Sequence, residues 1–280
     1  MRRGGEESSA STSARWLLLE AYASAYKAVK VYFRYPAWIV GDLLATPLWL
    51  LVFIYPVLMF LPYDKWRSPE TYEFFYWGMV SWSVISTALW SIGGAIRSEQ
   101  QVGTLEQLFL TNADRVVLFL GRLASSSIGL IIELAYMSLI VYLLFGVQVR
   151  VLNPPLLAVA LLLGLTASLG FGSVYGALVL HVKSPGAVAN ILQFALVILC
   201  GVFYPASRLP DFVEPLAYLV PFTYAIDLIR HAAMGTDTLL PAPLELAVLA
   251  LYSVVLVALG YAALRRVELV SKRRGKLGFY

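Results

Sequence analysis

The stretch LLAVALLLGLTASLGFGSVYGALVL, from Leu156 to Leu180, contains no charged side chain. A bilayer core about 30 Å thick is crossed by roughly 20 apolar residues of helix, so this stretch predicts a membrane-spanning helix. Within it Gly164, Ser168, Gly172 and Gly176 recur every four positions. Small side chains at that spacing let helices approach closely, and we therefore expect a tight contact between this span and its neighbours.

The rest of the chain is apolar to a similar degree. Of its 280 residues 60% are hydrophobic and only 14% are charged, and the mean hydropathy is +0.75. Six stretches are long enough to cross a bilayer. The sequence therefore predicts an all-α integral membrane protein with six transmembrane helices in a domain over 36–266. These spans are expected at about 38–61, 74–96, 123–146, 156–180, 186–204 and 246–264.

A seventh apolar stretch, Phe212 to Ile229, does not fit a full crossing. Only 12 residues separate Glu214 from Asp227, and two of them are prolines. Such a segment is short for a span and suits a re-entrant or interfacial hairpin. We expect this hairpin over 205–235, on the extracellular side, between spans five and six.

Basic residues give the orientation, because loops rich in lysine and arginine stay in the cytoplasm. With six spans, 16 of the 21 lysines and arginines fall on the side that holds both termini. We expect a disordered cytosolic stretch over 1–14 and a basic cytosolic tail over 267–280. The basic residues flank spans instead of forming a stripe on a soluble fold, so anionic lipid headgroups are the expected partner and nucleic acid is not.

The segment over 15–35, before the first span, is amphipathic. Lys27, Lys30 and Arg34 fall on one side at helical spacing, and Tyr22 and Val29 fall on the other. This pattern predicts a helix lying in the cytoplasmic membrane interface. A cytosolic helix packed on a partner is the alternative.

A few polar residues fall inside the expected spans, where a carboxylate is costly and usually faces the protein interior. Glu133 lies deepest and has no obvious basic residue at the same depth. Either it is protonated, or it faces a polar path with Asn190 and Gln193 of span five. Asp42 and Glu245 lie near span ends, where both could reach water.

Aromatic residues make up 14% of the chain. Trp49 and Phe53, among others, could line a path for a flat or amphipathic substrate. The simpler interpretation of most aromatic residues is interfacial belts and helix packing.

A polar stretch, EQQVGTLEQLFL over 99–110, interrupts the apolar chain between spans two and three. As a helix it places Val102, Leu105 and Leu108 on one stripe and most of its carboxylates and amides off it. One face could pack under the bundle while the other contacts a partner. An ordinary solvated loop helix would show the same composition.

The stretch resembles the signature of type-2 ABC transporter permeases through Glu99 and the run Gly103-Thr104-Leu105-Glu106. The hairpin resembles the same family in Phe203-Tyr204-Pro205, in Pro221-Phe222-Thr223-Tyr224 and in Arg230, although Phe222 stands where a leucine is commoner. The resemblance extends from about Arg15 to Arg266. Those permeases also have six spans, an interface helix before span one and a hairpin between spans five and six.

The resemblance implies a role for each of these parts. The helix at 99–110 would be a coupling helix whose Glu99 and Glu106 face a cleft on a separate ABC ATPase subunit, with a second contact at His181 and Lys183. The hairpin residues Pro205, Pro221, Thr223, Tyr224 and Arg230 would lie on the substrate's way out. The chain has no Gly-x-x-x-x-Gly-Lys-Ser/Thr phosphate loop, so ATP and Mg would bind to the partner subunit.

The implied protein is the permease of an exporter in the cell membrane, working as a homodimer or with a paralogue. Its cargo would be a hydrophobic or amphipathic molecule, drug-like, lipid or glycolipid. The chain itself would not be an enzyme, because no His-Glu-x-x-His or Gly-x-Ser-x-Gly motif occurs. A single cysteine, Cys200, excludes a disulfide framework or a cysteine metal cluster. The alternative is an ion-coupled secondary transporter that uses Glu133 as its proton site.

Overall fold

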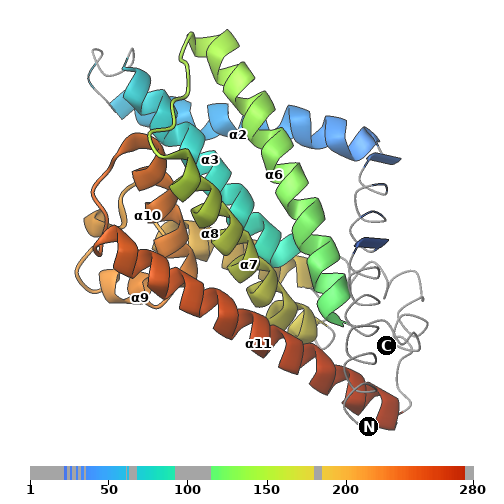
Figure 1. Ribbon diagram of the computed structural model, residues 1–280. Helices are drawn as coiled ribbons and strands as arrows, with labels where there is room; N and C mark the ends of the chain where they lie inside the picture. The colour runs from blue at the N-terminus through green and yellow to red at the C-terminus, as the bar shows by residue number, and fades with distance from the viewer. Residues whose placement is uncertain are drawn as a thin grey trace, which may run out of the picture.

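The computed structural model describes residues 36–60, 68–91, 115–179 and 185–274, with isolated positions at 22–23, 26, 30, 33–34 and 62. Over these residues the chain is helical and contains no strand (Figure 1). The coupling helix at 99–110, the link at 181–184, most of the interface helix and the stretch at 1–14 lie outside them. In chain order the helices are α2 Pro36–Phe60, α3 Pro69–Trp90, α6 Arg115–Phe145, α7 Pro154–Val179, α8 Pro185–Leu199, η2 Ala206–Arg208, α9 Glu214–Tyr218, α10 Pro221–Met234 and α11 Ala242–Arg274.

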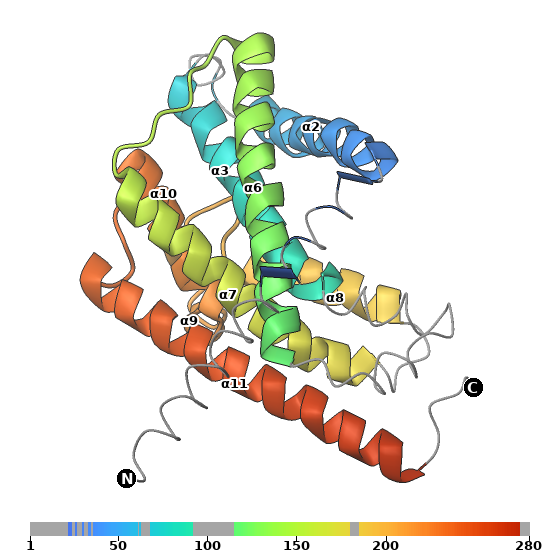
Figure 2. The same ribbon diagram turned by 45° about the vertical axis from the view of Figure 1, so that its right-hand side comes forward.

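Helix α7 is the centre of the fold, with α3 and α10 packed on it and α11 along its length, while α2 lies at the opposite edge (Figures 1 and 2). Its small residues permit this contact. The Gly170 backbone is so close to α11 that an added Cβ would lie 2.7 Å from the carbonyl carbon of Leu256, and Gly172 faces Ala88 of α3 as closely. The Ser168 hydroxyl donates to the Val84 carbonyl oxygen at 2.7 Å. The predicted tight contact of this span is confirmed.

Four of the described helices are long and apolar enough to cross a membrane. The qualifying segments are Leu43–Phe60, Gly121–Phe145, Pro154–Val179 and Ala242–Val267. Helix α3 is long enough at 22 residues but not apolar enough to qualify, and α8 has only 15 residues. The all-helical membrane class is therefore confirmed, and the count of six spans stays a prediction.

Two boundaries differ from those expected. Helix α3 begins at Pro69, five residues before the predicted span, because a proline at the first helical position is already in helical geometry. Helix α11 continues to Arg274, well into the segment expected as a tail. The last ten residues of this helix, RRVELVSKRR over 265–274, contain no glycine or proline and are rich in residues with good helix propensity, so nothing in them ends the helix.

The segment expected as a hairpin folds back on the bundle. Helix α8 ends in a turn at Gly201, whose φ is +64°, and η2, α9 and α10 follow. Helix α10 runs antiparallel to α7: Ala225 lies beside Gly164, and farther along the Asn153 amide donates to the Ala232 carbonyl oxygen at 2.8 Å. With 14 residues α10 is about 21 Å long, too short to cross a bilayer core by itself.

Candidate transport path and hairpin anchor

One side of α3 carries a row of polar contacts. Tyr76, Ser83 and Trp90 are spaced by seven residues, two turns of helix, and so lie on the same side. The Tyr76 hydroxyl donates to the Leu134 carbonyl oxygen at 2.9 Å, and the Ser83 hydroxyl donates to Glu133 Oε1 at 2.5 Å. The Trp90 indole donates to Gln193 Oε1 at 2.6 Å. We call Tyr76, Ser83 and Trp90 the α3 polar row; it binds polar groups of α6 and α8.

The row brings two of the predicted path residues to one side of α3. Glu133 of α6 and Gln193 of α8 contact it two turns apart, so they share a face without touching each other. Asn190 lies one turn earlier on α8, and no other part of the described chain covers its side chain. Sequence reasoning named Trp90 only as one of several aromatic residues and missed Ser83, although the seven-residue spacing of polar groups in span two was a signal for both.

An aromatic cluster joins α2, α3 and the turn after α8. It consists of Trp49, Phe53, Trp82 and Phe203. Phe53 is central to it, with its ring centroid 4.4 Å from that of Phe203 and 5.4 Å from that of Trp82. Trp49 stacks on Trp82 at 6.2 Å. The two aromatic residues predicted for the path thus pack on each other, and Phe53 also packs on the turn after α8.

Arg230 anchors the hairpin. Its side chain is only 3% exposed, and its Nη1 donates to the carbonyl oxygens of Gly201 at 2.7 Å and Tyr204 at 3.1 Å. Nη2 donates to the Val202 carbonyl oxygen, and the guanidinium lies 4.2 Å from the centroid of the Phe74 ring. Burial lowers the pKa of Arg230 to about 10, an effect that Asp227 opposes. The group therefore stays charged at neutral pH and binds the turn between α8 and η2 to α10.

The other predicted hairpin residues also hold this segment together. The Thr223 hydroxyl donates to the Ala217 carbonyl oxygen, and the Tyr224 hydroxyl donates to that of Tyr218, both at 2.7 Å. Pro221 opens α10 at its first position. Pro205 precedes η2 and is exposed. Together with Arg230, these contacts give Thr223 and Tyr224 a structural role inside the hairpin.

Two carboxyl groups meet where α10 contacts the start of α11. Asp227 accepts a hydrogen bond from the Leu239 amide at 2.8 Å. Burial raises the pKa of Asp227, although the Leu239 amide and the charge of Arg230 oppose this. Glu245 is fully buried and faces Asp227, so the expectation that Glu245 reaches water is wrong. The reason is that α10 and the loop before α11 cover the first turn of that helix.

Comparison with known families agrees with this architecture. The sequence model of the family described as ABC-2 type transporter matches residues 20–234. The chain therefore belongs to the ABC-2 type transporter family, as the resemblance indicated, and is a multi-pass membrane transport component. A search of curated proteins gives no match. Across the part of the chain with described structure, no group of three or more His, Cys, Asp or Glu side chains is placed to hold a metal ion.

The match contains all the residues assigned to ATPase coupling. Glu99, Gly103, Thr104, Leu105 and Glu106, with His181 and Lys183, fall within 20–234. These positions lie outside the described residues, and the side chain of Asp42 does too. Their roles stay predictions.

Proposed function

We propose that this chain is the permease subunit of an ATP-driven exporter in the cell membrane, with both termini in the cytoplasm. The observation that carries the proposal is membership of the ABC-2 type transporter family over residues 20–234. The chain contains no phosphate-binding loop of its own, so the energy comes from a separate ABC ATPase subunit that binds ATP and Mg. Two copies of the permease, or one copy and a paralogue, pair with two ATPases.

The moving parts follow from this assignment. Closure of the ATPases displaces the coupling helix at 99–110, with Glu99 and Glu106 in the ATPase cleft and His181 and Lys183 at a second contact. Helix α8 carries the motion toward the hairpin, because Arg230 binds the turn directly after α8. The cargo, a hydrophobic or amphipathic molecule, leaves past the hairpin at 205–235.

The path runs along α3. Glu133 and Gln193 on the α3 polar row supply charge and hydrogen-bonding capacity, and the aromatic cluster with Trp49 and Phe53 supplies apolar surface. A mixed polar and aromatic lining suits an amphipathic cargo, because ligand sites combine apolar walls with a few placed polar groups.

The proposal is tested with the chain and its ATPase reconstituted in liposomes, by measuring ATP hydrolysis and ATP-dependent transport of a fluorescent amphiphile together. Glu106→Arg should leave insertion and basal hydrolysis intact and abolish transport, because a cation replaces the carboxylate in the cleft. Transport at the wild-type rate in Glu106→Arg would contradict the coupling assignment. ATP-independent transport driven by a proton gradient would favour an ion-coupled carrier.

A further inference from the structure

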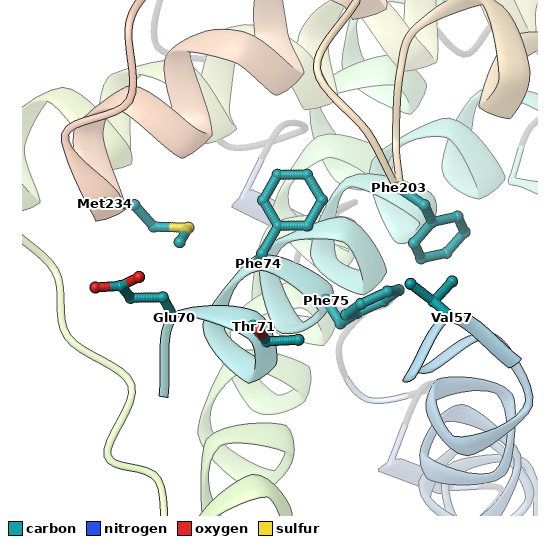
Figure 3. A pocket seen from close by; sticks show the side chains of 7 residues that line it. All are labelled: Val57, Glu70, Thr71, Phe74, Phe75, Phe203 and Met234. Atoms are coloured by element: carbon teal, nitrogen blue, oxygen red, sulfur yellow. The ribbon is translucent and has the colours of Figure 1, made fainter. Parts of the chain in front are cut away.

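A cavity of about 330 Å³ lies at the N-terminal end of α3, apart from the α3 polar row (Figure 3). It is open on one side and is bordered by α2 through Val57, by α3, by the turn after α8 through Phe203 and by the C-terminal end of α10 through Met234. The volume falls in the range of small-molecule sites, about 300–1,000 Å³. Its lining consists of Val57, Glu70, Thr71, Phe74, Phe75, Phe203 and Met234.

The lining is mostly apolar and aromatic, and its single charge is negative. Three phenyl rings, a thioether and a valine give an apolar, polarisable wall, and the Glu70 carboxylate supplies the negative charge. The negative face of an aromatic ring attracts cations, and a carboxylate adds a full charge at the mouth. Figure 3 shows Glu70 and Met234 on one side of Phe74, with Phe75, Phe203 and Val57 on the other.

Among the described residues, the Arg230 guanidinium lies against this wall and is already hydrogen-bonded. Arg230 lies over the Phe74 ring and is not among the residues that line the cavity. Its Nη atoms donate to the carbonyl oxygens of Gly201, Val202 and Tyr204. Three carbonyl oxygens accept hydrogen bonds from this guanidinium, and Glu70 is the one charged residue among those that line the cavity.

The cavity and the aromatic cluster share one residue, Phe203. Phe203 belongs to both, since its ring stacks on Phe53 at 4.4 Å and lies 6.1 Å from the ring of Phe75. The ring of Phe203 therefore links the pocket wall to the predicted path residue Phe53.

We propose that the cavity is a binding site for an amphipathic organic cation, with its aryl groups against Phe75 and Phe203 and its charge facing Glu70. The use of this site by the cargo during transport rests on the proposed function. Binding itself does not, because it requires only this chain.

The test is equilibrium binding to the purified full-length chain in lipid nanodiscs, without ATPase or ATP. The probe is radiolabelled tetraphenylphosphonium, and the comparison is tetraphenylborate, which carries the same four phenyl groups with the opposite charge. We expect saturable phosphonium binding that is at least several-fold tighter than borate binding. Glu70→Gln should weaken phosphonium binding by about fivefold, the size expected of a partly exposed charge contact.

Glu73→Gln is the matched control, because Glu73 is in the next turn of α3 and does not line the cavity. It should change phosphonium affinity by less than about twofold. Phe203→Ala should weaken the binding of both probes. Thermal unfolding of each variant shows whether the variant is folded.

No saturable phosphonium binding to the folded wild-type chain, or equal affinity for the two probes with no effect of Glu70→Gln, would overturn the proposal. The proposed function is judged separately by whether an ATPase co-purifies with the chain. An ATPase partner without phosphonium binding would remove only the site. Phosphonium binding with the expected Glu70 dependence supports the site whether or not an ATPase is found.

Discussion

The Nη1 atom of Arg230 lies 2.7 Å from the carbonyl oxygen of Gly201, across 29 residues of chain. Gly201 ends the turn of α8 with a positive φ, and an added Cβ there would lie 2.6 Å from the Tyr204 carbonyl oxygen. The turn is therefore shaped to present several carbonyl oxygens to one guanidinium. Arg230 therefore links α10 directly to the turn at the end of α8.

Arg230→Ala should destabilise the chain by about 2–4 kcal/mol, because it leaves buried carbonyl oxygens without a donor. The stability of Arg230→Lys should lie between those of the wild type and Arg230→Ala, since an ammonium keeps the charge but cannot reproduce the planar fork of donors. Thermal unfolding in detergent checks the order. Arg208→Lys is the control, because Arg208 is exposed on η2. If Arg230→Ala unfolds at the wild-type temperature, the anchor assignment is wrong.

Gly172→Ala should destabilise the packing of α7 on α3 by about 1–3 kcal/mol, the usual cost of overfilling a packed interface. The added Cβ would meet the Ala88 backbone, which cannot move as a flexible side chain can. Gly186→Ala is the control, because an added Cβ there has nothing within 4 Å. Equal unfolding temperatures for the two variants would contradict this packing.

Asp227 should make stability fall as the pH rises. A carboxyl whose folded pKa lies above its ordinary value of 3.8 binds its proton more tightly in the native state. Its stabilisation is therefore full at low pH and is lost as the pH rises from about 4 through the raised folded pKa. Arg230 and His231 of α10, Glu245 of α11 and the Leu239 amide face this group.

Unfolding temperatures between pH 4 and pH 7 check this prediction. Asp227→Asn should flatten the slope, because asparagine keeps an acceptor for the Leu239 amide but does not titrate. Asp237→Asn, an exposed residue of the following loop, should keep the wild-type slope. Parallel slopes for wild type and Asp227→Asn would show that another group carries the pH dependence.

Glu133→Gln should reduce transport of a cationic amphiphile by about fivefold, the difference of about 1 kcal/mol between a charged and a neutral acceptor. The amide oxygen can still accept from Ser83, so the fold should be unchanged. ATPase binding should also be unchanged, because Glu133 lies within α6 and far in sequence from the coupling residues. Transport at the wild-type rate would contradict a path role for Glu133 and leave it with a structural role only.

The sequence predicted the class and the tightest contact of this fold from local patterns. Apolar run lengths indicated membrane helices, and the four-residue spacing from Gly164 onward indicated the face of α7 that packs. The short proline-containing stretch near Phe212 forms the short helices α9 and α10, and the re-entrant hairpin stays a prediction. These features are local, so a single sequence carries them.

Other features depend on contacts between distant segments. The burial of Glu245 follows from the way α10 and its loop cover α11, which no pattern around Glu245 reveals. The partners of Glu133 and Gln193 come from α3, 50 and 103 residues away. The seven-residue spacing of polar groups in span two indicates the α3 polar row. It does not indicate which residues of α6 and α8 bind to that row.

The most direct test of the central claim is purification of the tagged chain in mild detergent from its own host, after cross-linking in the membrane, with mass spectrometry of the proteins that accompany it. The account predicts an ABC ATPase subunit in stoichiometric amount, cross-linked near residues 99–110. Repeated absence of any ATPase would contradict the exporter assignment and favour an ion-coupled carrier centred on Glu133.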